Sequence, residues 1–202
     1  LSPTYSGKER IMKILPTLAL LLGFLLLSAC STTKPDSSRP QAWLKAGTLV
    51  TLPPPGISPS ITQQQLLTAQ VKGKTQSLMV LLNADQQKIM LAGLSPLGIR
   101  LFRLTYDSQG VKTEQSMTLP ELPPASQVLA DIMLSYWPIS AWQPQLPKGW
   151  TLKDVDSRRE LRDDQGELIE TIHYLMRNGS RQPVSVHHHR FGYVISIQHL
   201  DS

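Results

Sequence analysis

The sequence predicts a mainly β domain of the α+β class, in which a curved antiparallel sheet is covered by one helix. Short segments with alternating apolar residues recur between residues 65 and 119 and again between residues 150 and 200. The turns between them have hairpin length, which is typical of antiparallel strands. The single stretch with helical periodicity lies between the two series, and one amphipathic helix is a natural cover for a sheet face. A flat β-sandwich is the alternative fold.

Five strands are expected in the first series. Lys72-Gly73 and the polar segment 83–87 supply two of the turns, and the segment 107–110 (Asp-Ser-Gln-Gly) supplies another. The predicted strands cover residues 65–71, 75–82, 88–94, 99–106 and 111–119.

A helix is predicted over residues 126–136, after Pro123-Pro124 has ended the first series. Ser126 is the expected N-cap, and Pro138 should stop the helix. Four apolar residues fall at helical spacing and form one stripe, namely Leu129, Ile132, Met133 and Tyr136. A proline-rich loop with Trp142 follows.

Five more strands are expected in the second series. Its turns include residues 163–166 (Asp-Asp-Gln-Gly) and Asn178-Gly179, both strong turn signals. The predicted strands cover residues 150–155, 158–162, 168–176, 183–189 and 193–200.

Alternation along the strands, together with the helical stripe, predicts which side chains point toward the helix side of the sheet. Such side chains either line a cavity for an apolar ligand or form a packed core, and the pattern alone permits both. The candidate cavity residues are Phe102, Leu104, Tyr106, Leu129, Ile132, Met133, Tyr136, Ile172, Tyr174, Tyr193, Ile195 and Ile197.

The beginning of the chain has the pattern of a bacterial secretory signal peptide. Lys13 precedes an apolar run over residues 14–27, which ends in Leu27-Ser28-Ala29-Cys30. This ending resembles the lipobox of lipoproteins. The resemblance implies that the thiol of Cys30 receives a diacylglyceryl group, that cleavage occurs just before Cys30, and that a fatty acid such as palmitate acylates the new amino terminus. The alternatives are a plain signal peptide with a chance cysteine, or a membrane-spanning anchor.

These features divide the chain into four parts. We expect an upstream extension over residues 1–11, a lipoprotein signal peptide over 12–29, a lipidated flexible tether over 30–43 and a single β-rich domain over 44–202. The tether is rich in Ser and Pro and has no hydrophobic period. Ser31, by resemblance to enterobacterial lipoproteins, implies the periplasmic face of the cell outer membrane.

Two stretches resemble a family of uncharacterised bacterial outer-membrane lipoproteins, often encoded in gene clusters for aryl polyenes. They are Leu94-Ser95-Pro96-Leu97-Gly98-Ile99-Arg100-Leu101-Phe102 and the stretch 128–138 (Val-Leu-Ala-Asp-Ile-Met-Leu-Ser-Tyr-Trp-Pro). The order of elements also resembles LolB, the outer-membrane receptor that takes lipoproteins from the carrier LolA. This resemblance implies a half-barrel with a helical lid and an apolar cavity for acyl chains.

The chain departs from LolB at one point. LolB directs an exposed leucine on a loop between strands toward the membrane, whereas the turn 83–87 is wholly polar here. Trp142 is therefore the candidate for contact with a membrane or a partner.

Catalytic and metal-binding patterns are weak. Alternate histidines at His187 and His189 supply only two of the three or four ligands that zinc needs. A nucleophile elbow, a P-loop and a dinucleotide-binding glycine pattern are all missing from the sequence. The sequence thus predicts no enzyme, no metal site and no cofactor. The net charge of +5 is scattered, which argues against a nucleic-acid partner.

The expected function is that of an outer-membrane lipoprotein that holds an acyl or aryl-polyene lipid in a half-barrel cavity and assists its transfer or placement. The expected partners are the outer membrane, through the lipid on Cys30, the hydrophobic ligand, and a periplasmic carrier or lipoprotein. The alternative is a structural or assembly lipoprotein with a packed core that binds a periplasmic protein.

Overall fold

The computed structural model describes residues 39–116 and 123–201, which form one large sheet, a small hairpin and two helices. The predicted upstream extension, the signal peptide, Cys30 and most of the tether lie outside these residues. The elements are β1 (Gln41–Lys45), β2 (Thr48–Thr51), β3 (Ile61–Val71), β4 (Lys74–Ala84), β5 (Ile89–Leu94), β6 (Arg100–Asp107), β7 (Gly110–Gln115), α2 (Ala125–Tyr136), α3 (Ile139–Trp142), β8 (Thr151–Val155), β9 (Arg158–Arg162), β10 (Leu168–Arg177), β11 (Ser180–His188) and β12 (Tyr193–His199).

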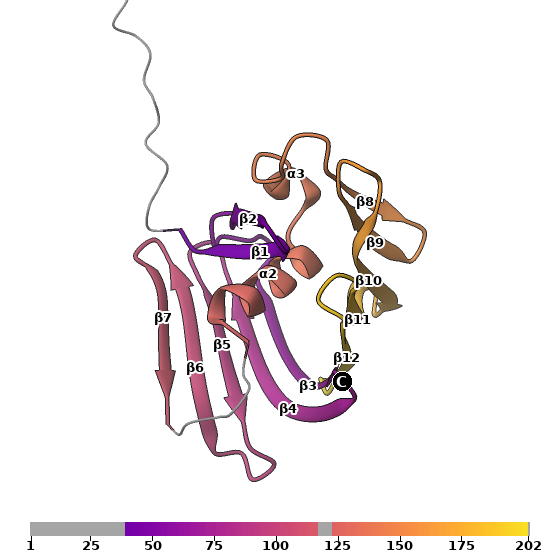
Figure 1. The fold of residues 1–202 in the computed structure, drawn as a ribbon. Helices are drawn as coiled ribbons and strands as arrows, with labels where there is room; N and C mark the ends of the chain where they lie inside the picture. The colour runs from indigo at the N-terminus through magenta and orange to yellow at the C-terminus, as the bar shows by residue number, and fades with distance from the viewer. Residues whose placement is uncertain (1–38, 117–122, 202) are drawn as a thin grey trace, which may run out of the picture. The chain divides into compact units, whose positions relative to one another are not determined.

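The large sheet has ten antiparallel strands in the order β7-β6-β5-β4-β3-β12-β11-β10-β9-β8. It consists of two meanders, β3–β7 and β8–β12, which are joined where β3 pairs with β12. The sheet curves strongly around α2 without closing into a barrel (Figure 1). All ten predicted strands are confirmed to within a few residues, except that residues 117–119 of the fifth lie outside the described residues. The flat sandwich is not observed in the described part of the chain.

The hairpin of β1 and β2 was not predicted. β1 begins at Gln41, inside the segment expected to be a tether, so the domain starts before residue 44. Alternation places Leu44 and Val50 in the core and leaves Trp43 and Leu49 exposed. The hairpin contacts α2, and the carbonyl of Pro54 just after it accepts a hydrogen bond from Nε1 of Trp137 at 3.2 Å.

Helix α2 lies where it was predicted, but its first turn differs from the prediction. Ser126 lies inside the helix, and Pro124 occupies the N-cap position. The carbonyl of Pro124 already accepts hydrogen bonds from the backbone amides of Gln127 and Val128, so the helix begins one residue earlier. At the other end, the helix stops before Pro138 as expected.

Helix α2 is buried on more than its predicted stripe. Leu129 and Met133 of the stripe are inaccessible to solvent, but so are Ala130 and Leu134 on other sides of the helix. The curved sheet and the β1–β2 hairpin both contact α2. The helix is therefore an internal element and not an outer lid.

Candidate functional site

The concave face of the sheet brings together the side chains that the sequence predicted for a ligand cavity. The strand register places Ile197, Leu67 and Leu78 in one row across β12, β3 and β4. All twelve predicted residues except Tyr193 belong to the apolar core or pack against it. Tyr193 is half-buried and contacts α2 through its hydroxyl group.

Burial divides the twelve residues into two groups. Seven are almost inaccessible to solvent: Phe102, Leu104, Tyr106, Leu129, Met133, Ile172 and Tyr174. Five are only half-buried: Ile132, Tyr136, Tyr193, Ile195 and Ile197. The second group is the one that a ligand can reach without rearrangement of the core.

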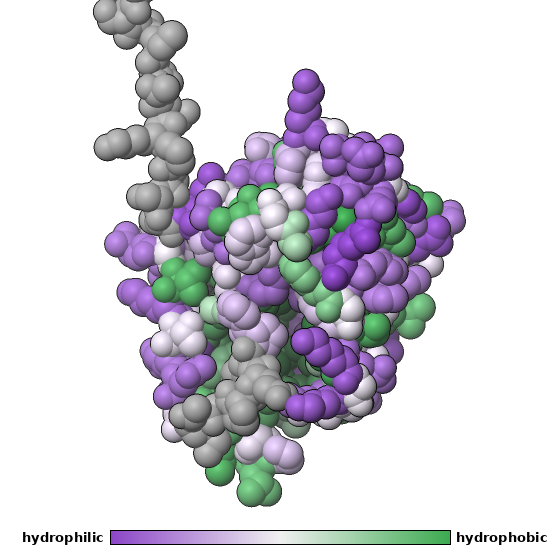
Figure 2. All heavy atoms as spheres, in the orientation of Figure 1, coloured by the Kyte–Doolittle hydropathy of each residue, from purple (hydrophilic) through white to green (hydrophobic). Residues whose placement is uncertain are grey.

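Six half-buried apolar side chains define what we call the concave apolar surface. Four come from the sheet and two from the helix: Leu67, Leu78, Ile195, Ile197, Ile132 and Tyr136. Figure 2 shows hydrophobic atoms recessed between hydrophilic ones on this side of the molecule. An apolar, concave surface with few polar groups is typical of a site for a hydrophobic ligand.

Three tyrosine hydroxyl groups connect α2 to the sheet beside this surface. Tyr174 donates a hydrogen bond to the carbonyl of Ser135 at 2.7 Å. The hydroxyl of Tyr136 accepts one from Nε2 of Gln65 at 2.7 Å. The hydroxyl of Tyr193 donates to the carboxyl group of Asp131, with oxygen–oxygen distances of 2.9 and 2.8 Å. Both polar and apolar contacts therefore fix α2 against the concave face of the sheet.

Asp131 belongs to a buried group of ionisable side chains that the sequence analysis did not single out. Glu170 of β10 and His188 of β11 lie in the same region and are 1% and 0% exposed. Burial raises the pKa of Asp131 to about 7. Burial, and then the charge of Asp131, raises the pKa of Glu170 well above its usual range. Burial, and then the charge of His189, lowers the pKa of His188 to about 4.

The C-terminal end of α2 carries a buried cation. Nη1 of Arg159 on β9 donates to the carbonyls of Leu134 and Trp137, both at 2.8 Å, so it satisfies acceptors that a helix leaves free. Its Nε also donates to the carboxylate of Asp154 at 2.9 Å. Asp154 is consequently part of an ion-pair network, and Arg181 binds the same carboxylate at 2.9 Å.

Trp142 does not present an apolar surface, so its predicted role in membrane or partner contact is wrong. Its side chain is 0% exposed, and its Nε1 donates to the carbonyl of Met133 at 3.0 Å. The short helix α3 turns the indole inward onto α2. The proline-rich segment is thus a packing element.

The most exposed large apolar side chain in the described residues is Leu97, which is 86% exposed in the loop between β5 and β6. Ile99 in the same loop is 61% exposed. Oγ of Ser95 accepts hydrogen bonds from the backbone amides of both residues at 3.2 Å, which fixes the loop. Figure 2 shows hydrophobic atoms at the lower end of the molecule, where Figure 1 draws this loop.

The three consecutive histidines divide between the two sheet faces. His188 is buried on the concave side, whereas His189 is exposed on the convex side, where its ring centroid lies 3.9 Å from that of His187. In the ranges 39–116 and 123–201, no three His, Cys, Asp or Glu side chains are placed to hold a metal ion.

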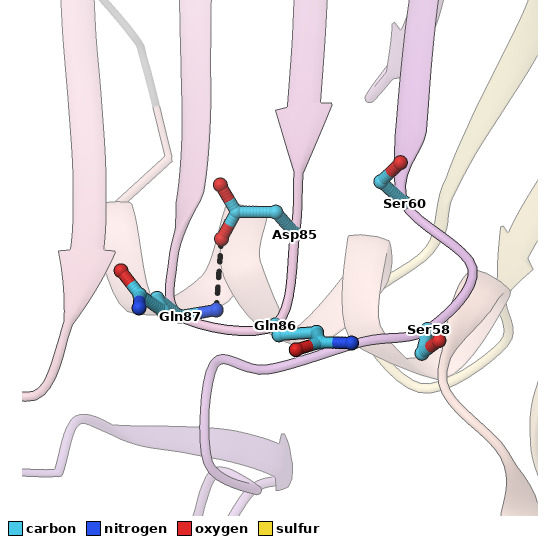
Figure 3. Close-up of a pocket in the computed structure, with 5 residues that line it drawn as sticks. All are labelled: Ser58, Ser60, Asp85, Gln86 and Gln87. Atoms are coloured by element: carbon cyan, nitrogen blue, oxygen red, sulfur yellow. Dashed lines mark hydrogen bonds between the residues drawn. The ribbon is translucent and has the colours of Figure 1, made fainter.

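Two surface pockets lie away from the concave apolar surface. The first is polar and is lined by Ser58, Ser60, Asp85, Gln86 and Gln87 (Figure 3). The carboxylate of Asp85 accepts hydrogen bonds from the backbone amides of Gln87 at 2.8 Å and Lys88 at 3.0 Å, so it is engaged in the turn. The second pocket lies between α3 and β8, along residues 143–153. Neither pocket contains a predicted ligand residue.

No helix among the described residues has the length and hydrophobicity needed to cross a membrane.

A family described as "Protein of unknown function (DUF3261)" matches residues 62–201 of the chain. No curated protein matches it. Among solved structures, a DUF1329 family protein from Desulfovibrio piger is similar, with 11% sequence identity and a TM-score of 0.35. The similarity covers 69% of this chain and 83% of that protein.

Proposed function

The chain belongs to the DUF3261 family of proteins of unknown function, and within that family we propose that it is an outer-membrane lipoprotein that binds a hydrophobic lipid. The ligand would be an acyl chain or an aryl-polyene lipid, held against the concave apolar surface of a LolA/LolB-like half-barrel. The role is not enzymatic. The protein would assist the transfer of this lipid to the outer membrane or its placement there.

The concave apolar surface is the observation that carries this proposal. Its six side chains are half-buried although they lie beside a fully packed core. A long acyl chain that covered them would remove apolar area from water, and each buried methylene contributes about 0.8 kcal/mol. Such binding needs no polar recognition and suits a lipid ligand.

The membrane contact that we propose combines the lipid on Cys30 with the loop between β5 and β6. The three acyl chains expected on Cys30 are enough for stable anchoring, so the loop would serve to orient the domain on the membrane. Leu97 and Ile99 supply exposed apolar side chains for that purpose. A periplasmic carrier or another lipoprotein is the proposed protein partner.

The second candidate function is that of a structural or assembly lipoprotein that binds a periplasmic protein. The packed state of seven of the twelve predicted cavity residues favours it. In that case, the exposed loop with Leu97 would contact the partner protein.

The first test compares two neighbouring residues of β12 that lie on opposite faces of the sheet. Ile195 belongs to the concave apolar surface, whereas Val194 is also half-buried but faces the convex side. The full-length precursor with Cys30 replaced by Ser is expressed to the periplasm, and native mass spectrometry measures bound lipid. We expect a co-purified acyl or polyene mass in the parent and in Val194→Arg, and its loss in Ile195→Arg.

Circular dichroism of each variant establishes that the domain is folded. An apo mass for the parent, with no uptake of added fatty acids or phospholipids, would refute the lipid-binding function. Equal lipid occupancy in Val194→Arg and Ile195→Arg would refute the assignment of the ligand to the concave face.

A further inference from the structure

Four ionisable side chains meet between α2 and the second meander. Asp131 comes from α2, Glu170 from β10, His188 from β11 and Tyr193 from β12. The Tyr193 hydroxyl donates to Asp131, and the side chain of Gln127 also hydrogen-bonds to this carboxyl group. We call these four residues the acid cluster.

Two members of the acid cluster have buried polar atoms without a hydrogen-bond partner among the described residues. Both carboxyl oxygens of Glu170 and Nε2 of His188 are buried without a partner among the described residues. Nε2 of His188 lies 3.9 Å from Oε2 of Glu170, too far for a direct hydrogen bond. Nδ1 of His188 accepts from the backbone amide of Phe191 at 3.2 Å, which leaves the ring neutral with its proton on Nε2.

Among the residues that the structure describes, no cation near the cluster is free to balance two ionised carboxylates. Arg159 of β9 is bound to the helix carbonyls and to Asp154. On β1, Lys45 pairs with Asp163 at 2.8 Å.

The other elements packed against α2 supply no counter-charge either. On β7, the register places Lys112 opposite Thr105 and Glu114 opposite Arg103, on the convex side of the sheet. On β3, the residue that reaches α2 is the neutral Gln65. From β10, the phenol of Tyr174 donates to a helix carbonyl.

We propose that the acid cluster is a proton-dependent latch for α2. Helix α2 stays docked against the concave face of the sheet while the carboxyl groups of Asp131 and Glu170 carry protons. Loss of those protons places uncompensated negative charge between helix and sheet, loosens α2 and exposes more of the concave apolar surface. The part of this inference that concerns ligand access rests on the proposed lipid-binding function, whereas the movement of α2 does not.

The direction of the pH dependence follows from burial. Free Asp and Glu side chains have pKa values of about 4, whereas burial raises the pKa of Asp131 to about 7 and that of Glu170 well above its usual range. The docked state therefore binds more protons than the released state. The contribution of Asp131 to the advantage of the docked state is complete in acid and is lost as the pH rises through about 7, and that of Glu170 is lost as the pH rises through its own raised pKa.

His188 acts in the opposite direction and in a different pH range. Because burial lowers its pKa to about 4, the docked state is penalised only when the pH falls below the free value of 6.5. Above pH 6.5 the ring is neutral in both states. A measurement on the alkaline side consequently reports on the carboxyl groups alone.

The test is hydrogen–deuterium exchange of the full-length chain, measured by mass spectrometry at about pH 6.5 and about pH 8.5. Protection factors corrected for intrinsic exchange are compared between α2 and the strands β4 and β5. We expect the protection of α2 to fall between the two pH values, while that of β4 and β5 stays constant. The fall is at most about tenfold per pH unit for each carboxyl group that is protonated in the docked state and ionised in the released state.

Two variants assign the effect to the cluster. Asp131→Asn keeps an acceptor for Tyr193 and Glu170→Gln keeps the side-chain volume, and neither can ionise. Each should reduce the pH dependence of α2, because one of the two titrating carboxyl groups is removed, and Glu170→Gln keeps the test decisive if Asp131→Asn does not fold. Glu167→Gln, an exposed carboxylate close to β10, is the matched control and should behave like the parent.

Constant protection of α2 in the parent would overturn the latch. So would an equal loss of protection in β4 and β5, or an unchanged pH dependence in Glu170→Gln. Lipid occupancy at the two pH values is read separately: we expect release at about pH 8.5 in the parent and retention in Glu170→Gln. Failure to bind lipid at either pH would refute the proposed function, while the exchange data alone would decide the latch.

Discussion

The ring of Phe102 packs over Gly93, its register partner on β5. A Cβ added at Gly93 would lie 2.1 Å from Cε1 of this ring, so the core at this point depends on the absence of a side chain. Phe102 is one of the buried residues of the concave face. The close approach of Phe102 is thus the reason for a glycine inside this strand.

We predict that Gly93→Ala lowers the free energy of unfolding by about 1–3 kcal/mol, since the ring must leave its rotamer or the strands must separate. Urea denaturation followed by circular dichroism measures the change. Ala92→Ser, one position away and half-buried on the convex face, is the control and should cost less than about 1 kcal/mol. Equal stability of Gly93→Ala and the parent would contradict the packing described here.

For single residues, the sequence predicts which face of the sheet a side chain lies on better than how deeply that side chain is buried. Strand alternation correctly placed Phe102 and Ile195 on the face toward the helix. It could not show that Phe102 is sealed in the core while Ile195 is half-buried, because that depends on elements distant in sequence. The acid cluster was missed for a similar reason. Asp131 and Glu170 are single charges within apolar segments, and only their burial shows that they differ from surface carboxylates.

At the level of elements, the β1–β2 hairpin explains why the sequence did not predict that α2 is buried on more than one side. A helix with one apolar stripe on a sheet should expose its other side. Here the hairpin also contacts the helix, and Ala130 and Leu134 are buried in addition to the stripe. The hairpin itself has only four- and five-residue strands, too short for alternation to stand out beside the polar, Pro-rich segment before it.

We predict that the hairpin stabilises the helix through its inward-facing residues alone. Leu44→Ala should lower the free energy of unfolding by about 2–5 kcal/mol, because Leu44 is 0% exposed and its removal leaves a cavity. Trp43→Ala removes the larger but 47% exposed neighbour and should cost about 1 kcal/mol or less. Thermal unfolding followed by near-ultraviolet circular dichroism compares the two variants. A smaller effect for Leu44→Ala than for Trp43→Ala would contradict the assignment of the stabilisation to the inward-facing residues.

For the whole molecule, the proposed membrane contact leads to a binding prediction. The loop between β5 and β6 presents Leu97 and Ile99 to solvent. With Cys30 replaced by Ser, attachment to anionic phospholipid vesicles would rest on this loop. We expect Leu97→Glu to reduce co-sedimentation with such vesicles at least several-fold. Leu175→Glu, at an exposed leucine on β10, should leave it unchanged. Equal loss in both variants would indicate a general effect of charge.

Local sequence patterns predict only part of the architecture. Turns such as Asn178-Gly179 and Lys72-Gly73 define two meanders, because hairpin-length connections force neighbouring strands to pair. No local sequence pattern predicts that β3 pairs with β12, because their residues are more than a hundred positions apart. The curvature of the sheet, the enclosure of α2 and the concave apolar surface all depend on this one non-local pairing.

That pairing also sets the order in which the chain can assemble as it leaves the ribosome. The first meander is complete long before β12 has been made, so the hydrogen-bonding edge of β3 and the apolar floor beside it must wait uncovered. Non-local strand pairing is slow compared with hairpin formation. The nascent protein therefore passes through a period in which its half-built sheet is open to other chains, and a holding chaperone would protect it until its last strand arrives.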